Sequence, residues 1–336
     1  MNKAFFFLFF PLFLIISCSK DDHISNFPAK VSFDVSGRML EGKRINCMDF
    51  DTKGNIFIAS DKEIYYKNGS DQKTYNIDYS ILDIAIAPDE TLWIGTNGGG
   101  LGHMTDKGIT WYISNNSGLP RDYVRNVEIA PDGNIWFSSC AFRLGGLGVY
   151  DGEKFEFYTP ENSPLNQNII DDIEIDKEGK VYIATSGTVG KSNIYRISEK
   201  SWDCLGDEGG TFYWVFSFTI GTAGIIYLVE DFSLSSSFHT SNTLFQFFND
   251  NEWKKIDASD KLGYSFFTRI KADKRNYCWI ADFGDNSPIL RVYDGESWLS
   301  SPEGIFPEDY ITVIEVDSEN NIWVGTSQNG VFILNQ

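Results

Sequence analysis

The 336-residue sequence has few basic residues, few histidines and no apolar segment long enough to span a bilayer. Lysine and arginine total 28 against 47 aspartates and glutamates, which gives a formal net charge of −19 at pH 7. Nucleic-acid phosphates and anionic lipid surfaces are bound through basic faces. We therefore expect no nucleic-acid partner and no direct binding to an anionic membrane, and we interpret the acidity as a well-solvated surface.

Histidines number three, His23, His103 and His239, and no HxH or HExxH spacing joins them. The sequence also lacks the signatures of a serine or cysteine nucleophile and of a phosphate-binding loop followed by a helix. We therefore predict no metal, no cofactor and no catalytic residue, and we favour a protein that is not an enzyme.

Cysteines number five, and none has the close spacing of a zinc or redox site. One of them, Cys18, is assigned to lipid attachment below. Because cysteine packs as a small hydrophobe, we predict that the other four are buried free thiols: Cys47, Cys140, Cys204 and Cys278.

The N-terminus has the pattern of an export signal. Lys3 precedes an uncharged run over residues 4–16, which is too short to span a bilayer but fits a signal-peptide core. The run ends at Ser17-Cys18, which resembles a bacterial lipobox, although an ordinary secretory signal that happens to end at a cysteine is the alternative. We predict a signal peptide over 1–17, lipidation of Cys18 and a tether over 18–29, so that the lipid is the only membrane anchor.

The residues after Cys18 indicate a cellular location for the protein. The sequence over 19–22, Ser-Lys-Asp-Asp, resembles the lysine-plus-acids signal that sends lipoproteins to the cell surface in Bacteroidetes-type bacteria. The resemblance implies an outer-membrane lipoprotein, either on the cell surface or on the periplasmic face.

A short motif returns seven times along the remaining chain: a polar tight turn, a branched apolar residue and then an aromatic residue. The aromatic residues are Phe57, Trp93, Trp136, Tyr182, Tyr227, Trp279 and Trp323. Their separations are 36, 43, 46, 45, 52 and 44 residues. A period of about 40 to 50 residues made of short strands is typical of a β-propeller with one four-stranded sheet per repeat.

The strand patterns agree with that fold. In the third copy we expect strands near 127–129, 135–137, 148–150 and 155–158. The segments 92–94, 135–137, 181–183 and 322–324 are apolar at both parities, which indicates strands covered on both faces. We predict an all-β fold, a single seven-bladed β-propeller over 30–336, whose last blade is closed by an N-terminal strand at Lys30–Ser36.

The repeats resemble the propeller family of the extracytoplasmic sensor regions of bacterial two-component regulators. The resemblance rests on Leu92-Trp93-Ile94-Gly95-Thr96-Asn97-Gly98-Gly99-Gly100-Leu101 and on Asn321-Ile322-Trp323-Val324-Gly325-Thr326. It implies a sensor-type propeller that binds a ligand, and the family's setting suggests a glycan. We see no transmembrane helix, kinase or DNA-binding region after Gln336, so we expect that the chain does not signal alone.

Two other propeller families share features with these repeats. The virginiamycin B lyases have similar repeats but use two histidines and a glutamate late in the chain, and no histidine follows His239 here. The segment Thr105-Asp106-Lys107-Gly108-Ile109-Thr110-Trp111 resembles the Asp-box of sialidases, which is a folding motif distant from their active site. We interpret it as a simple hairpin.

Two groups of residues are candidate sites. The centres of the innermost strands predict an acidic channel lined by Asp49, Glu128, Glu174, Lys271 and Glu315. We expect the channel to be hydrated and too wide to chelate calcium. The longer loops between strands share one face, and there we predict a ligand site at Tyr123, Arg143, Trp214, Tyr310, Arg121 and Arg269.

The function predicted from the sequence is therefore non-catalytic binding of a ligand, such as a glycan, or of a protein partner on the loop face. A carbohydrate-active hydrolase or lyase on the same scaffold is the alternative. A purely structural subunit beside an outer-membrane protein partner is the third.

Overall fold

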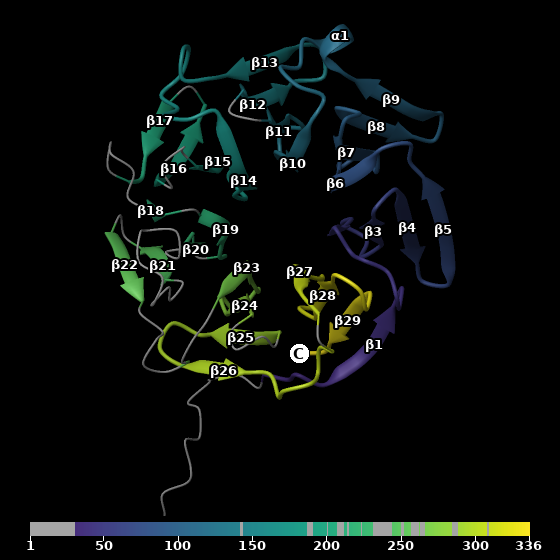
Figure 1. Cartoon of the computed structure of the whole chain (residues 1–336), viewed down its shortest axis with the longest axis vertical. Coiled ribbons are helices and arrows are strands. Elements are labelled where there is room, and N and C mark those ends of the chain that lie inside the picture. The colour runs from purple at the N-terminus through teal and green to yellow at the C-terminus, as the bar shows by residue number, and fades with distance from the viewer. Residues whose placement is uncertain are drawn as a thin grey trace, which may run out of the picture.

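The computed structural model describes residues 31–336 apart from 142–143, 187–190, 200, 207–211, 214, 223, 231–243, 250–251, 257–261, 263–265, 284–287 and 308. The described residues form a β-propeller, in which antiparallel sheets surround a central axis (Figure 1). Within them, no helix is long and apolar enough to cross a membrane. One helical turn, α1 (Ser114–Ser117), follows the second sheet.

The described strands form seven sheets, and six of these are each built from consecutive strands. The first holds β2 (Cys47–Phe50), β3 (Ile56–Ser60), β4 (Glu63–Asn68) and β5 (Asp71–Asn76). The second holds β6 (Ser80–Ile86), β7 (Leu92–Asn97), β8 (Leu101–Thr105) and β9 (Gly108–Tyr112). The third holds β10 (Val124–Ile129), β11 (Ile135–Ala141), β12 (Leu144–Tyr150) and β13 (Phe155–Tyr158).

The fourth sheet holds β14 (Ile169–Ile175), β15 (Val181–Ser186), β16 (Lys191–Ser198), β17 (Ser201–Cys204) and the short β18 (Phe212–Tyr213). The fifth holds β19 (Val215–Ile220), β20 (Ile226–Glu230), β21 (Leu244–Asn249) and β22 (Glu252–Ile256). The sixth holds β23 (Phe267–Ala272), β24 (Cys278–Asp282), β25 (Ile289–Tyr293) and β26 (Trp298–Ser300). The seventh joins β27 (Ile311–Val316), β28 (Ile322–Thr326) and β29 (Val331–Leu334) to β1 (Val35–Met39).

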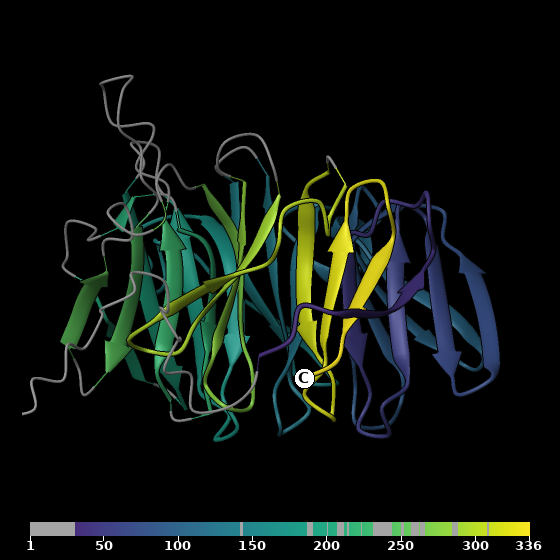
Figure 2. The same cartoon turned by 90° about the horizontal axis from the view of Figure 1, so that it is seen from below.

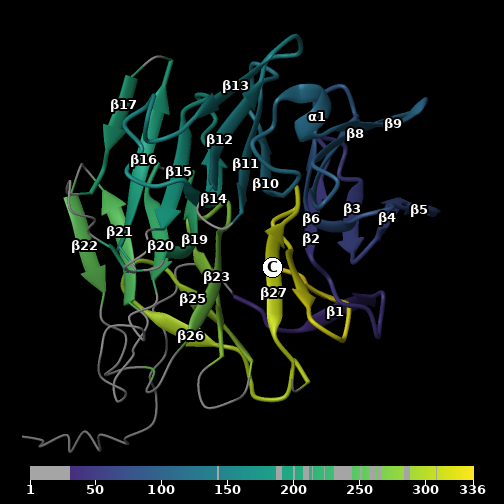
Figure 3. The ribbon, with the colours of Figure 1, turned by 45° about the horizontal axis from the view of Figure 1, so that its top comes forward.

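The first strand of each repeat lies innermost, so β2, β6, β10, β14, β19, β23 and β27 surround the axis (Figures 1 and 3). Tight turns join the first strand to the second and the third to the fourth. Since neighbouring strands are antiparallel, these turns share one end of the ring, here called the turn face, where the C-terminus also lies (Figure 2). The remaining connections lie at the opposite end, here called the loop face.

Apolar side chains fill the spaces between neighbouring sheets. Strands β3, β15 and β24 are buried at every position, and β7 is buried except at its last residue. The predicted coverage of both faces is therefore confirmed for 92–94 and 181–183. Trp136 and Trp323 are partly exposed, so the prediction is wrong for one residue in each of the other two segments.

The predicted position of the closing strand is wrong. The strand that pairs with β29 is β1, and its register runs from Val35 opposite Leu334 to Met39 opposite Val331. Residues before it pack against the sixth sheet instead, where Phe33 meets Trp279 edge-on at 5.8 Å between ring centroids. The closing strand begins later than predicted because Val31 and Phe33 bury their side chains in the core shared by the sixth and seventh sheets.

The expectation of one uniform four-stranded sheet per repeat is also wrong. The fourth sheet has a fifth strand, because β18 pairs with the first residues of β16, Lys191 opposite Tyr213 and Ser192 opposite Phe212. The ring is thus built from unequal sheets, and the seventh is completed only when the two ends of the propeller pair.

The cysteine prediction holds in part. Cys47 and Cys278 are buried free thiols, and burial raises the pKa of each well above its ordinary value. Cys204 is exposed at the end of β17, an outer strand, so the prediction is wrong there. The side chain of Cys140 lies outside the described residues.

Candidate functional site

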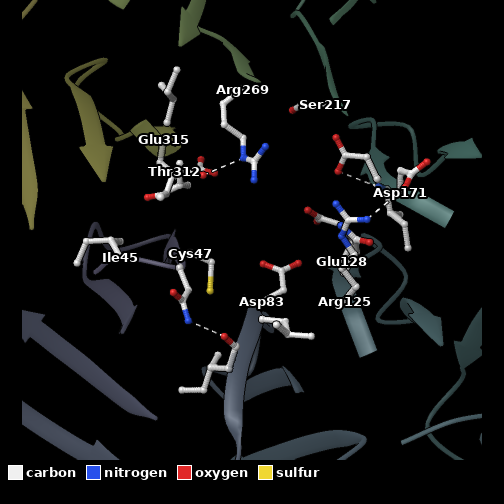
Figure 4. Close-up of a pocket in the computed structure, with 18 of the residues that line it drawn as sticks. Ile45, Cys47, Asp83, Arg125, Glu128, Asp171, Ser217, Arg269, Thr312 and Glu315 are labelled. Atoms are coloured by element: carbon white, nitrogen blue, oxygen red, sulfur yellow. Dashed lines mark hydrogen bonds and ion pairs between the residues drawn. The ribbon is translucent and has the colours of Figure 1, made fainter. Parts of the chain in front are cut away.

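A central cavity of about 460 Å³ lies inside the ring (Figure 4). It is lined by residues of the innermost strands. In six of these strands the pairing register shifts near the loop face, as at Ile81/Asp83 and Phe267/Arg269. Such a bulge adds one residue and re-aims the side chains beside it. Consequently, consecutive residues such as Asp171 and Asp172 both line the cavity.

The deepest described layer lies opposite the repeating aromatic residues. Asp49 pairs with Phe57, Glu128 with Trp136 and Glu174 with Tyr182. Lys271 pairs with Trp279, and Glu315 pairs with Trp323. The five residues predicted to form the channel therefore occupy equivalent positions, and the cavity is lined by all of them except Asp49.

Lys271 connects carboxylates from two other sheets. Its Nζ atom lies 3.3 Å from Glu315 Oε2 and 3.7 Å from Glu174 Oε1. Burial alone would lower the pKa of Lys271, but Glu174, Glu315 and Glu128 raise it well above its ordinary value. The lysine therefore stays charged, and it lies within ion-pair distance of carboxylates from two other sheets.

Buried carboxylates also bind the next sheet along the ring. Asp49 accepts a hydrogen bond from the backbone N–H of Ile86 at 2.8 Å, and Asp83 accepts one from Val127 at 2.9 Å. Burial raises the pKa of Asp49 to about 7 and that of Asp83 to about 8. At neutral pH these carboxyls are therefore divided between the neutral and charged forms.

The same burial acts on the other acids of the cavity. It raises the pKa of Asp172 to about 6 and that of Glu174 to about 7. It also raises the pKa of Glu315, and it raises the pKa of Glu128 well above its ordinary value with help from the neighbouring Glu174 carboxylate. The part of the cavity lined by these carboxyls consequently carries much less negative charge at neutral pH than its number of acidic residues indicates.

Three arginines gather where the cavity opens to the loop face: Arg125 and Arg269, from two different sheets, and Arg44, from the segment that precedes β2. Arg269 donates from Nε to the carbonyl of Thr312 at 2.8 Å and from Nη1 to that of Thr268 at 2.7 Å. Burial lowers the pKa of Arg269, the nearby Asp172 opposes this, and the other two arginines lower it further. The three cations are thus close enough to repel one another.

The three arginines differ in whether a carboxylate balances their charge. Arg125 forms an ion pair with Asp171 at 3.2 Å. Arg44 donates to the side-chain oxygen of Asn46 at 3.3 Å. Within the described part of the chain, neither Arg44 nor Arg269 forms an ion pair with a carboxylate, and the buried Thr312 hydroxyl and Asp171 Oδ2 have no hydrogen-bond partner. The three arginines, Asp171, Thr312 and Tyr123 are here called the channel mouth.

The residues predicted on the loop face are only partly brought together. Tyr123 and Arg269 both line the channel mouth. Arg121 is exposed outside it, and Tyr310 is 54% exposed and stacks on Phe283 at 4.2 Å between ring centroids. Arg143 and Trp214 lie outside the described residues, as does Cys18.

Sequence reasoning missed Arg44, Arg125, Asp83, Asp171 and Asp172. A usable signal was present for two of them, because Asp83 and Asp172 stand two residues before the central residues Ala85 and Glu174 and share their face by strand alternation. Arg125 and Asp171 occupy bulge positions, which alternation does not predict. Arg44 precedes its strand.

The comparison with protein families supports the resemblance drawn from the repeats. Residues 305–328 match the family described as Two component regulator propeller. The chain carries a two-component-regulator propeller repeat. This segment contains all of β27 and β28, with Glu315 of the channel and Trp323 opposite it. No curated protein sequence matches the chain.

Solved structures with the same fold share little sequence with it. Virginiamycin B lyase from Staphylococcus aureus aligns with a TM-score of 0.69 and 17% identity, over 88% of this chain and 96% of the lyase. The extracellular domain of BT4673 from B. thetaiotaomicron aligns with a TM-score of 0.65 and 18% identity, over 90% of this chain and 39% of that one. YCF48 bound to D1 peptide aligns with a TM-score of 0.65 and 13% identity, over 89% and 93%.

These similarities establish the propeller fold and not an activity. The one histidine in the described part of the chain, His103, does not line the central cavity. No group of three or more histidine, cysteine, aspartate or glutamate side chains in that part is placed to hold a metal ion. The distinctive chemistry of the channel mouth is therefore its unpaired cations.

Proposed function

We propose that this protein is an extracytoplasmic lipoprotein that binds an anionic ligand at the channel mouth without catalysing a reaction. The observation that carries the proposal is the Arg269 guanidinium, which is partly buried at the mouth and forms no ion pair among the described residues. A buried charge is costly unless it is paired. An acid group from a ligand supplies the missing partner.

The polar groups near Arg269 restrict the class of ligand that the channel mouth can bind. Thr312 supplies a buried hydroxyl, and Asp171 supplies a carboxylate oxygen without a partner. A ligand with both an acid group and hydroxyl groups can accept from Arg269 and Thr312 and donate to Asp171. Tyr123 adds an aromatic side chain at the edge of the cavity. An acidic sugar combines these features, and we propose a glycan fragment bearing a carboxylate or sulfate.

The setting of related propellers supports a sensing or binding role. The matched repeat takes its name from two-component regulators, and the BT4673 structure is that of an extracellular domain. The predicted lipid at Cys18 would hold the propeller at the outer membrane, on the cell surface or the periplasmic face. Ligand binding at a rigid ring of loops needs no catalytic group.

Calorimetry on residues 30–336 tests the proposal. The titrants are uronic-acid oligosaccharides, sulfated disaccharides and neutral oligosaccharides of matched length. We expect saturable binding of an acidic member only, weakened at least about tenfold in Arg269→Leu, which corresponds to about 1.4 kcal/mol. Arg269→Lys keeps the charge but loses the fork that meets an acid group at two points, so we expect an intermediate affinity.

Arg196→Ala is the matched control. Arg196 pairs with Asp203 in the fourth sheet and is not part of the channel mouth. Unchanged affinity in Arg269→Leu, with the fold intact, rules out the channel mouth as the site. Release of products from a bound oligosaccharide would favour the alternative of a hydrolase or lyase.

A protein partner is the second candidate, because an acidic peptide also brings carboxylates to the three arginines. YCF48, a propeller of the same fold, has been solved with a peptide bound. The exposed Tyr310, stacked on Phe283, offers an apolar contact on the same face. Co-purification with an outer-membrane protein, lost in Arg269→Leu and without affinity for any acidic glycan, would favour this candidate.

A further inference from the structure

A second cavity, of about 500 Å³, lies on the turn face between the second and third sheets. It meets the turn that follows β6, whereas the channel mouth meets the start of the same strand, so the two cavities lie at opposite ends of β6. Its walls include Trp93, His103 and Tyr150, together with Pro88 and Pro131. Its volume is within the range of small-molecule sites, about 300–1,000 Å³.

The cavity lies beside two turns that lack an aspartate present in four of the seven repeats. Four repeats have an aspartate at the first turn position: Asp51, Asp176, Asp273 and Asp317. Each of these carboxylates accepts hydrogen bonds from the backbone N–H groups two and four residues later. Each turn is therefore closed by its own first residue.

In three of these repeats the same carboxylate also binds the aromatic residue six positions later. Trp279 Nε1 donates to Asp273 at 3.2 Å, and Trp323 Nε1 donates to Asp317 at 3.0 Å. The Tyr182 hydroxyl donates to Asp176 at 3.3 Å. The aspartate thus satisfies the polar end of the buried aromatic ring.

The second and third repeats have alanine at this position. Their turns read Ala87-Pro88-Asp89 and Ala130-Pro131-Asp132, so the carboxylate stands two residues later. There it accepts from the backbone of Thr91 or Asn134. Trp93, the aromatic residue of the second repeat, therefore lacks the aspartate partner seen in three other repeats. The short side chain of Ala87 leaves open space beside Trp93.

Two polar groups at this cavity are left without partners as a result. No hydrogen bond joins the Trp93 indole N–H, which borders the cavity, to the described residues, and His103 Nε2 is buried with no partner among them. The imidazole stacks on the indole at 4.2 Å between ring centroids and 7° between planes. A buried polar atom without a partner, such as His103 Nε2, is rare in native proteins and points to an absent ligand or solvent molecule.

The lining restricts the class of ligand. Its charged groups are the carboxylates of Asp89 and Asp132, and no lysine or arginine lines the cavity, which disfavours an anion. A cationic ammonium or guanidinium group would suit the carboxylates but has no acceptor for the indole N–H. A hydroxyl group accepts from the indole and donates to a carboxylate at the same time. The prolines and Ile135 provide apolar surface for the face of a ring.

We propose that this cavity binds an uncharged hydroxylated ring, with the size of one or two neutral sugar residues. The site is separate from the channel mouth and does not depend on the anionic ligand proposed there. Because hydroxyl groups replace the turn carboxylate found in other repeats, the ligand takes the place of an aspartate side chain.

Replacing Ala87 with the aspartate of the other repeats tests the proposal. The probes are methyl glycosides of neutral hexoses and their disaccharides, followed by tryptophan fluorescence and saturation-transfer NMR. We expect saturable binding to the wild-type protein and a loss of at least about tenfold in affinity in Ala87→Asp, since the new carboxylate fills the site. Ala130→Asp, the same change at a turn residue that does not line the cavity, is the matched control.

A second variant keeps the test independent of folding. His103→Phe retains a ring that can stack on Trp93 but removes Nε2, and we expect weaker binding there as well. Arg269→Leu should bind the methyl glycosides as the wild type does, which separates this site from the channel mouth. The proposal is overturned if no methyl glycoside binds the folded wild-type protein, or if Ala87→Asp and wild type bind equally.

Discussion

The ammonium group of Lys271 lies 3.3 Å from the Glu315 carboxylate of the neighbouring innermost strand. Because Glu174 of the fourth sheet lies 3.7 Å from the same ammonium, one cation compensates carboxylates of two sheets. Removing one partner of a buried ionic group leaves the other charge uncompensated, which typically costs about 3–5 kcal/mol. The lysine is therefore a structural residue of the channel.

We predict that Lys271→Met lowers the free energy of unfolding by about 3–5 kcal/mol at pH 8 and by less at pH 5, where the carboxyls can bind protons. Urea denaturation at the two pH values measures this. Lys177→Met removes the exposed contact with Glu178 and should cost at most about 1 kcal/mol. Equal costs for the two variants would contradict a compensating role for Lys271.

Asp83 predicts a pH dependence of stability. Burial raises its pKa to about 8 in the folded protein, against about 3.9 in an unfolded chain. Between these pH values the folded state holds a proton that the unfolded state releases, so the free energy of unfolding falls as the pH rises. One such proton gives a slope of at most about 1.4 kcal/mol per pH unit.

We expect Asp83→Asn to remove that contribution while still accepting the Val127 N–H. The stability of the variant relative to wild type should therefore increase steadily from pH 5 to pH 8, as measured by urea denaturation. Asp106→Asn, at an exposed turn, should show no such trend. A constant difference for Asp83→Asn across this range would show that the carboxyl does not hold its proton in the folded state.

Glycines of the loop between β7 and β8 differ in what surrounds them. Both Gly98 and Gly100 have positive φ, +96° and +70°. A Cβ at Gly98 meets nothing within 4 Å, whereas one at Gly100 would lie 2.1 Å from the carbonyl oxygen of Tyr112. We predict that Gly98→Ala costs about 1–2 kcal/mol through backbone strain alone, and that Gly100→Ala costs clearly more. Chemical denaturation compares them, and similar costs would refute the close approach.

Closure by β1 predicts the effect of truncation. A chain that begins at Glu41 lacks the partner of β29 and the contact of Phe33 with Trp279, so an unpaired strand edge is exposed. We expect a lower thermal midpoint and self-association by gel filtration. A chain that begins at Lys30 keeps these contacts and should behave as the full propeller does. Identical behaviour of the two truncated chains would exclude a closing role for β1.

The predicted lipid anchor has its own test. Cys18→Ala should move the protein from the membrane fraction to the soluble fraction of the cells that make it, because no helix in the described residues is apolar and long enough to replace the lipid. Metabolic labelling with a fatty acid should mark the wild type and not the variant. Retention of the unlabelled variant in the membrane fraction would argue against lipidation at Cys18.

Local patterns in the sequence determined the propeller and its repeat. An aromatic residue that follows each turn pairs with the centre of the innermost strand in every repeat, because hairpin pairing and strand alternation depend on neighbours in sequence. The same alternation predicted that Glu128, Glu174, Lys271 and Glu315 share the channel. The two Ala-Pro-Asp turns can also be read from the sequence, but no local sequence pattern shows that they lie beside a cavity.

Only the tertiary structure decided which distant residues meet. Arg125 and Arg269 come from two sheets and Arg44 precedes a third; they gather because the ring closes and because bulges in β10 and β23 re-aim side chains near the loop face. Closure also decided that β1 starts at Val35, since the apolar Val31 and Phe33 gain more from packing on the sixth sheet than from continuing the strand. These outcomes depend on the geometry of the closed ring, which no stretch of sequence contains by itself.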